Sequence, residues 1–440
     1  MALNERNMRC LKTQYYPTDY RSIGGNNIFI LNHAGSVGLY NGNISALTTD
    51  YADINNGTLL KSFRYDKLNR IRSMETTTLT GSNWGALTQN YATAYTYDPN
   101  GNFLTLSRKQ ENGQILGAYQ TYNYSADNNR LGSVDIGVAV LEQEYDKTGN
   151  FTASPLEQIF VEWNSAGKIK NVNVQWQNHG LEFYYNPTGQ RLGREKDWGG
   201  SMRDLDIYIR DAAGNVMAIY NHITLNGVME DSLRLIEQPI YGSQRLGVFK
   251  PQNMGISYNT SAPVYTQNPT RASGQRYYEL TDHLGNVTCV IRDSKVAVSD
   301  PLGLYPVAYY KHQYEVYNDY YPFGVNMRTG FFGNSLYRFG FNGQEREQTL
   351  GGMGSYSFEF RTLNIQWGRW LSIDLLSGQF PWVSPYAFVE NDVIRKKDIG
   401  GKYGSDGHYW TVYAMGVMIG LTNDDAIKWR EKQKLMITGQ

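Results

Sequence analysis

The stretch YTYDPNGN, residues 95–102, describes the end of a β-hairpin almost residue by residue. Its two tyrosines alternate with a threonine, which is the period of a strand with two different faces. Asp98 then opens a turn, Pro99 fixes the next φ angle, and Gly101 stands where a positive φ is needed. The stretch therefore predicts a type I turn that closes into a bulged hairpin.

The same arrangement returns along the chain: an aromatic residue, then Asp or Asn, two free positions, and Gly or Asn. The spacing of the aromatic positions varies, for example 32 residues from Tyr65 to Tyr97 but 18 from Tyr145 to Trp163. The copies therefore predict a series of hairpins with variable strand lengths and not a solenoid of fixed period. They are FRYDKLNR (Tyr65, Asp66), YNYSADNNR (Tyr124), QEYDKTGN (Tyr145, Asp146), VEWNSAGK (Trp163, Asn164), FYYNPTGQ (Tyr185, Asn186), IYIRDAAGN (Asp211, Gly214) and ELTDHLGN (Asp282, Gly285).

The composition is that of strands and turns. The 440 residues include 35 Tyr and 45 Gly, and only 19% are charged, which favours a mainly β protein over a helical or disordered one. The formal net charge is zero, and this argues against a nucleic-acid partner held through its phosphates. The N-terminus is too polar for a signal peptide, and the longest apolar run, Tyr409–Leu421, is too short to span a bilayer.

Cysteine and histidine give no sign of a metal site or a cofactor. Cys10 and Cys289 lie far apart and form no CxxC pair, so neither a disulfide framework nor a zinc ribbon is indicated. The histidines show no HxxxH or HExxH spacing. They are His33, His179, His222, His283, His312 and His408.

Changes in residue composition and spacing along the chain suggest four parts. Residues 1–25 are expected to be the end of an N-terminal fragment, residues 26–276 a strip of hairpin repeats, and residues 277–401 a segment dense in aromatics, Gly and Arg. Helical spacing begins only in residues 402–440, which we expect to be the start of a truncated C-terminal domain.

The long motifs after residue 276 resemble a known family. YELTDHLGNV, YYPFG, YRFGFNGQE, GRWLSIDLLSGQFPWVSPYAFVEND and KDIGGK, together with the YD hairpins, are similar to the rearrangement-hotspot (RHS), or YD-repeat, family, including its repeat-associated core, in the form common in Bacteroidota. The resemblance covers most of the chain, from about Tyr40 to about Gly401.

The resemblance implies a fold and a function. Family members form an antiparallel β-strip that curls into a hollow shell, or cocoon, around a C-terminal polymorphic toxin, with the core as a plug. Curling would also pair the strand edges, which otherwise promote aggregation. The implied partners are the chain's own C-terminal effector, the rest of the N-terminal shell and an immunity protein, and the implied location is secreted or at the cell surface, in interbacterial competition.

Two aspartates are candidate catalytic residues. In many family members the core ends in two DPxG elements whose aspartates resemble an aspartyl autoprotease, and the matching positions here are Asp374 (DLLSG) and Asp398 (DIGG). Two close carboxylates can share one proton and so act as acid and base. Leu375 and Ile399 replace both prolines, which implies a degenerate protease with slow or absent self-cleavage. The alternative is that both aspartates only cap turns, so whether the chain is an enzyme stays open.

Two other functions fit the sequence. A cell-surface adhesin or carbohydrate-binding β protein is one alternative, because Tyr- and Trp-rich strand faces can stack on sugar rings. The other is a carrier for an enzyme that begins after Gly401. Arg338, Arg361 and Arg369 alternate with aromatic residues, and we expect cation–π packing inside the plug from them and not nucleic-acid binding.

Overall fold

The structure of the chain is a computed structural model. It describes residues 10–14, 38–51, 57–80, 83–125, 127–199, 202–225, 228–229, 232–251, 255–257, 264–266, 272–301, 306–331, 337–347, 354–398 and 400–401. The chain divides into two compact units: unit 1 takes in Met1–Val140, Tyr321–Phe323 and Gly368–Gln440, and unit 2 takes in Leu141–Tyr320 and Gly324–Trp367.

The first sheet contains strands β1 to β10. Its strands pair in chain order, except that β5 pairs only with β4. They are β1 (Cys10–Gln14), β2 (Ala46–Asp50), β3 (Leu59–Tyr65), β4 (Ile71–Thr80), β5 (Asn83–Trp84), β6 (Thr88–Tyr97), β7 (Phe103–Arg108), β8 (Gln120–Tyr124), β9 (Leu131–Asp135) and β10 (Val140–Glu142).

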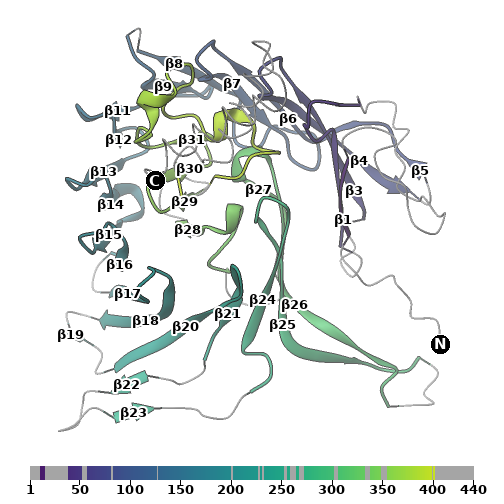
Figure 1. Cartoon of the computed structure of the whole chain (residues 1–440), viewed down its shortest axis with the longest axis vertical. Helices are drawn as coiled ribbons and strands as arrows, with labels where there is room; N and C mark the ends of the chain where they lie inside the picture. The colour runs from purple at the N-terminus through teal and green to yellow at the C-terminus, as the bar shows by residue number, and fades with distance from the viewer. Residues whose placement is uncertain are drawn as a thin grey trace, which may run out of the picture. The chain divides into compact units, whose positions relative to one another are not determined.

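The second sheet contains the seventeen strands β11 to β27, again in chain order. Figure 1 shows the hairpins from β11 to β18 following one another along one side of unit 2. The strands are β11 (Glu144–Tyr145), β12 (Phe151–Ser154), β13 (Ile159–Trp163), β14 (Ile169–Val174), β15 (His179–Tyr185), β16 (Arg191–Asp197), β17 (Met202–Arg210), β18 (Val216–Leu225), β19 (Val228–Met229), β20 (Ser232–Tyr241), β21 (Arg245–Phe249), β22 (Gly255–Ser257), β23 (Val264–Thr266), β24 (Arg276–Thr281), β25 (Val287–Val298), β26 (Tyr309–Tyr320) and β27 (Asn326–Phe331).

Short elements complete the described chain. Strands β28 (Glu345–Glu347), β29 (Ser355–Ser357) and β30 (Thr362–Asn364) form a small antiparallel sheet in unit 2, and β31 (Arg369–Trp370) lies in unit 1. The helices of the described residues are 3-10 turns: η2 (Gln175–Gln177), η3 (Pro322–Gly324), η4 (Phe341–Gly343), η5 (Ser377–Gln379) and η6 (Val389–Asn391). The predicted mainly antiparallel β fold is confirmed, whereas the helix predicted for residues 402–440 lies outside the described residues.

The turn at Asp98 shows why the repeat has its sequence. The Asn102 N–H donates to Asp98 Oδ1 at 2.8 Å, and the Asn102 amide donates to Asp98 Oδ2 at 2.8 Å. The Gly101 N–H closes the turn onto the Asp98 carbonyl at 3.1 Å, with a φ of 83° at Gly101. A register shift next to Tyr97 makes the hairpin a bulged one, as predicted. The carboxylate thus satisfies donors that the turn would otherwise leave unpaired.

Other copies repeat this chemistry. Asp146, Asp211 and Asp282 each accept the backbone N–H and the side-chain amide of an Asn four residues ahead. The reversals predicted at 100–101, 148–149, 166–167 and 188–189 are all confirmed, because each of these glycines has a positive φ and closes its turn by a backbone hydrogen bond.

At six hairpins, the aromatic residue before the turn ties its hairpin to the preceding one. The Tyr97 hydroxyl donates to the Ile71 carbonyl, two residues beyond the turn residue Asn69 of the previous hairpin, at 2.7 Å. We call this position the anchor. The same bond, always to the residue two positions after the preceding Gly or Asn, is made by Tyr65 to Ile44, Trp163 to Phe151, Tyr185 to Ile169, Tyr241 to Val216 and Tyr320 to Val287, at 2.6–3.1 Å.

Each unit has its own core. In unit 1, Phe103 packs with its ring centre 5.0 Å from Phe323 and 5.5 Å from Tyr122. Phe323 comes from the YYPFG motif, so this motif contributes to the core of unit 1. In unit 2, strands β21, β24, β25 and β26 bury an aliphatic and aromatic cluster: Val248, Tyr277, Val287, Val290, Val316 and Tyr337.

Candidate functional site

The last part of the core segment binds, in unit 1, to the hairpin end that carries Asp98. The Ser384 N–H donates to the Asn100 carbonyl at 2.7 Å, and the Asn391 amide donates to the Gly101 carbonyl at 2.8 Å. A Cβ at position 101 would lie 3.2 Å from the Asn391 amide nitrogen. Gly101 therefore serves both the turn and the close approach of the core.

Asp374, the first candidate catalytic residue, is fully buried in unit 1. Its Oδ1 accepts the Leu376 N–H at 2.7 Å, and its carbonyl accepts the Ser377 N–H at 3.0 Å. Leu375, which stands where the family has proline, is 71% exposed. Asp374 thus caps a turn, as the alternative interpretation expects.

Asp398, the second candidate, is also buried in unit 1, and its Oδ1 accepts the Gly401 N–H. Ile399, at the second lost proline, lies outside the described residues. Both aspartates therefore cap turns, and both side chains are buried. Their catalytic pairing stays a prediction.

A third buried acid, Asp392, was missed by the sequence reasoning. Arg395 binds its Oδ2 at 2.8 and 2.5 Å, but its Oδ1 is buried without a hydrogen-bond partner among the described residues. Burial raises the pKa of Asp392 to about 6, and Arg395 only partly opposes this rise. Asp392 ends the long core motif YAFVEND, but nothing in that motif shows that its carboxylate is buried.

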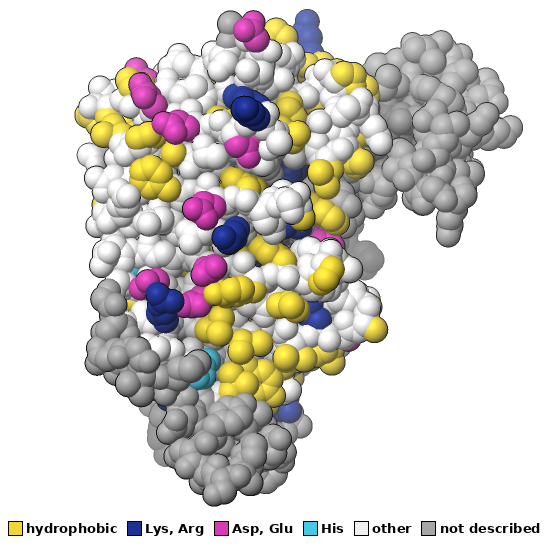
Figure 2. All heavy atoms as spheres, turned by 90° about the vertical axis from the view of Figure 1, so that its left-hand side faces the viewer, with side chains coloured by type: hydrophobic (Ala, Val, Ile, Leu, Met, Phe, Trp, Pro, Cys, Tyr) yellow, Lys and Arg dark blue, Asp and Glu magenta, His cyan; other side chains and the backbone are white. Residues whose placement is uncertain are grey.

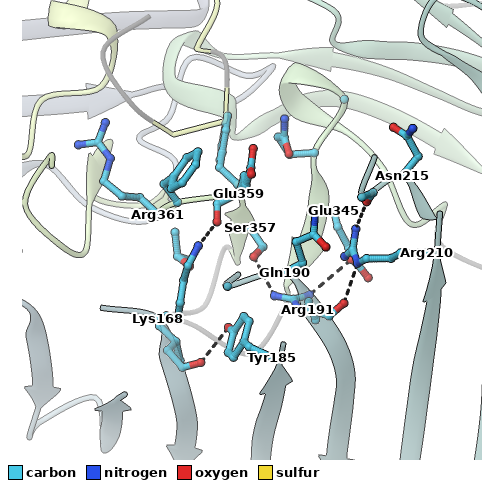
Figure 3. A pocket seen from close by; sticks show the side chains of 18 of the residues that line it. Lys168, Tyr185, Gln190, Arg191, Arg210, Asn215, Glu345, Ser357, Glu359 and Arg361 are labelled. Atoms are coloured by element: carbon cyan, nitrogen blue, oxygen red, sulfur yellow. Dashed lines mark hydrogen bonds and ion pairs between the residues drawn. The ribbon is translucent and has the colours of Figure 1, made fainter. Parts of the chain in front are cut away.

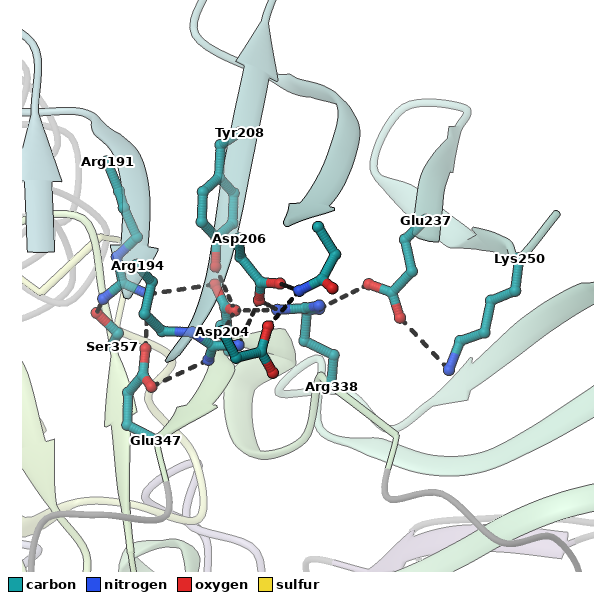
Figure 4. Close-up of polar contacts among 12 residues, drawn as sticks. Arg191, Arg194, Asp204, Asp206, Tyr208, Glu237, Lys250, Arg338, Glu347 and Ser357 are labelled. Carbon is teal, nitrogen blue, oxygen red and sulfur yellow. Dashed lines mark hydrogen bonds and ion pairs between the residues drawn. The ribbon is translucent and has the colours of Figure 1, made fainter. Parts of the chain in front are cut away.

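In unit 2 the core segment is joined to the strip by a buried network of charges (Figure 4). Glu347 on β28 accepts Arg191 at 2.6 Å and Arg194 at 3.2 Å, both from β16. Arg338, just before β28, reaches Asp206 on β17 at 2.9 Å and Glu237 on β20 at 2.6 Å. These pairs could not be predicted from the sequence, since 156 residues separate Arg191 from Glu347.

Glu345 lies at the centre of this network. It accepts Arg338 at 2.8 Å and the Tyr208 hydroxyl at 2.7 Å. Burial alone would raise the pKa of Glu345, but Arg338, Arg194 and Arg191 together hold it well below its usual range. Burial likewise opposes the ionisation of Asp206, and Arg338 and Arg194 still lower its pKa. The carboxylates therefore stay charged, and the network stabilises the docking of β28.

The three arginines of the core have different roles. Arg369 lies 5.2 Å from the ring centre of Tyr124 and 4.8 Å from that of Tyr386, and these contacts confirm its predicted cation–π packing. Arg338 does not follow this prediction, because buried carboxylates lie within its reach and an ion pair is stronger than a ring contact. Arg361 is buried.

The surface in Figure 2 carries acidic and basic side chains interspersed, with apolar side chains between them. On this face the described residues form no field of a single sign, which is the feature that phosphate binding needs.

Within the described parts of the chain, no group of three or more His, Cys, Asp and Glu side chains could hold a metal ion. Among the same residues, no helix has both the length and the apolar character needed to cross a membrane.

Comparison with known proteins places the fold. No family model matches the chain. Salivary gland surface protein 1 of Aedes aegypti is 22% identical over 322 residues, which is 70% of this chain and 8% of that protein. The crystal structure of TcdB2-TccC3-TEV matches 90% of this chain and 18% of its own with 13% identity, but its TM-score of 0.48 is too low to support an argument.

A chain of the Photorhabdus luminescens Tc holotoxin pore superimposes better. The match has a TM-score of 0.57 and 16% identity over 82% of this chain. Our chain spans only 16% of that toxin chain. The chain therefore has the antiparallel β-repeat fold of this segment of a Tc holotoxin.

Proposed function

We propose that the chain is the C-terminal end of an RHS-type toxin shell, which contains and delivers the effector that follows the core. The contact that carries the proposal is the docking of the core on the hairpin strip, through Asn391 and Ser384 in unit 1 and the charge network in unit 2. A plug needs such buried, polar and specific contacts. The fold shared with the Tc holotoxin segment supports the proposal.

The finer parts of the proposal concern boundaries, partners and location. The repeat strip runs over residues 26–276, the core over 277–401, and the effector starts at 402. The partners are this effector, the N-terminal remainder of the shell and an immunity protein, and the shell is secreted or displayed at the cell surface.

Protease protection tests containment. We expect the effector in the full-length gene product to resist a broad-specificity protease that digests the same effector expressed alone. Equal digestion of the two would contradict the proposal. An inert protein of similar size, fused in place of the effector, shows whether protection depends on the shell and not on the effector's own stability.

Self-cleavage is a separate proposal for Asp374 and Asp398. Their burial supports it, whereas the exposed Leu375 in place of proline leaves the turn less constrained. We expect slow or absent release of the effector near residues 402–403, because a displacement of about 1 Å can slow such chemistry roughly a hundredfold.

Intact mass over time tests this cleavage. Asp374→Asn and Asp398→Asn should abolish any release that wild type shows, since asparagine keeps the turn bonds but cannot exchange a proton. Equal release from wild type and both variants would exclude the aspartates from the mechanism. Leu375→Pro should accelerate release if turn geometry limits it.

A surface adhesin is the second candidate function. It is favoured by the match to a protein named for its surface location and by exposed aromatic side chains such as Tyr310 and Trp176. Binding of the chain to immobilised glycans, lost on Trp176→Ala, would support it, and a chain that binds no glycan would count against it.

A further inference from the structure

Unit 2 contains a cavity of about 350 Å³ between the hairpin ends and the core (Figure 3). One wall comes from three successive turns with Gly167, Gly189 and Gly214, and the other from Phe339 and the core residues 343–345 and 357–362. This volume is at the lower end of the range for small-molecule sites. The cavity can therefore hold a side chain or a small molecule.

Arg210 is the residue that departs from the repeat at this cavity. It occupies the anchor position directly before the turn at Asp211, where the neighbouring hairpins have Tyr185 and Tyr241. Its Nε–H donates to the Arg191 carbonyl at 2.9 Å. Arg191 lies two residues beyond Gly189, so Arg210 makes the anchor bond of the missing tyrosine. A tyrosine makes this bond in the neighbouring hairpins, so the architecture does not require an arginine here.

The rest of the Arg210 guanidinium is available to a ligand. Its Nη1 donates to the Gly214 carbonyl at 2.7 Å, and these two bonds use two of its five N–H groups. Among the described residues it pairs with no carboxylate, although it is half-buried. Burial lowers the pKa of Arg210, and the charge of Glu345 opposes this shift only in part.

Basic residues outnumber acidic ones in the lining of the cavity, but Arg191 and Arg245 already pair with Glu347 and Glu279. Glu345 and Glu359 are the acidic residues among those that line it. Glu345 is bound by Arg338 and Tyr208, and among the described residues it makes no ion pair with Arg210. The basic lining residues are Lys168, Arg191, Arg210, Arg245 and Arg361.

Two amide side chains stand beside Arg210. Gln190 and Asn215 follow the glycines of two successive turns and line the same wall (Figure 3). Gln190 packs onto Gly214, because a Cβ at that position would collide with its Nε2. The contact with Gly214 holds Gln190 in place, and the two amides provide neutral polar groups next to Arg210.

We propose that this cavity binds the carboxylate of a small organic acid or of an acidic side chain, with Arg210 as the main contact. A planar guanidinium matches a carboxylate in two-point geometry. The proposal does not depend on the toxin-shell function, because it rests on the cavity and on the exchange of an anchor tyrosine for arginine.

Calorimetric titration of the chain tests the ligand class. The probes are glutarate, its uncharged analogue glutaramide, and the peptides acetyl-Gly-Glu-Gly-amide and acetyl-Gly-Gln-Gly-amide. We expect an acidic probe to bind and its neutral analogue to bind about tenfold more weakly or not at all. Binding of glutarate alone identifies a small acid, and binding of the Glu peptide identifies a polypeptide source. Binding of neither acid would overturn the proposal.

Arg210→Tyr is the decisive variant. It restores the anchor of the neighbouring repeats, so the hairpin should keep its fold and its bond to the Arg191 carbonyl, while acid binding should weaken about tenfold or more. Lys196→Gln is the matched control, since it removes one positive charge from a neighbouring cavity of unit 2. Unchanged binding by Arg210→Tyr, or equal loss in both variants, would overturn the assignment of Arg210.

Discussion

A single hydroxyl explains why the repeat prefers tyrosine at the anchor. The position requires a flat apolar body that packs at the hairpin end and a donor at its far edge that reaches the previous hairpin. Tyr97 supplies both, and Trp163 replaces it with an indole N–H at 2.6 Å from its acceptor. Phenylalanine has the body without the donor. The anchor bond therefore explains why tyrosine recurs before the turns of the repeat.

Tyr97→Phe tests the anchor bond. It leaves the Ile71 carbonyl without this donor and should cost about 1 kcal/mol of unfolding free energy, measured by urea denaturation. Tyr184→Phe is the control, because the Tyr184 hydroxyl meets the side chain of Glu195 at the surface, and its loss should change stability little. Equal effects of the two substitutions would contradict the structural role of the anchor.

Asp392 gives unit 1 a pH dependence of unusual sign. Its pKa rises from 3.8 to about 6 on folding, so between these values the folded state binds more protons than the unfolded state. This group's contribution to stability therefore falls as the pH rises from about 4 to about 6, by ~3 kcal/mol in total, and is constant above.

The variant Asp392→Asn isolates this effect. The difference in unfolding free energy between wild type and variant should change with pH from 4 to 6 and then level off, because all other carboxylates cancel in the difference. Parallel stability curves over this range would show that Asp392 keeps an ordinary pKa.

At the scale of elements, the charge network fixes β28 on the strip. Glu347→Gln removes a negative charge that pairs with the buried Arg191 and Arg194. The free energy of unfolding of unit 2 should therefore fall by about 3–5 kcal/mol. Arg203→Gln, which breaks an exposed pair with Glu195, should cost under about 1 kcal/mol. Urea denaturation of both variants measures these losses of unfolding free energy. A loss for Glu347→Gln as small as that for Arg203→Gln would contradict a role of Glu347 in docking β28.

The network also resists acid. Because the pKa of Glu345 is depressed on folding, its contribution is complete above the ordinary glutamate pKa and is lost only as the pH falls below that range. Mild acidification should therefore leave β28 docked, as hydrogen exchange of the β28 amides at pH 7 and pH 5, corrected for intrinsic rates, can check.

At the scale of the whole molecule, the sequence predicts what is local. The turns at Asp98, Asp146 and Asn164 were predictable because every group that makes them lies within five residues, and the mainly β fold followed from their repetition. The resemblance identified Asp374 and Asp398, and the structure adds their burial and turn-capping bonds.

What the sequence did not predict is non-local. The partners of Arg338, the burial of Asp392 and the ligand-facing role of Arg210 depend on which hairpin ends meet the core. Because the strand lengths vary along the strip, the sequence does not show which hairpin end contacts which part of the core. The sequence shows that Arg210 takes the place of the aromatic residue before its turn. The significance of this exchange depends on the bond that the anchor makes, which only the structure shows.

The anchor bond always points backwards along the chain, from a donor in one hairpin to a carbonyl in the hairpin made before it. During synthesis on the ribosome, each anchor residue therefore emerges after its acceptor, so the anchor bond itself needs no residue that is still inside the exit tunnel. The anchor bonds can therefore form in chain order, whereas the contacts with the core must wait until the core has been made.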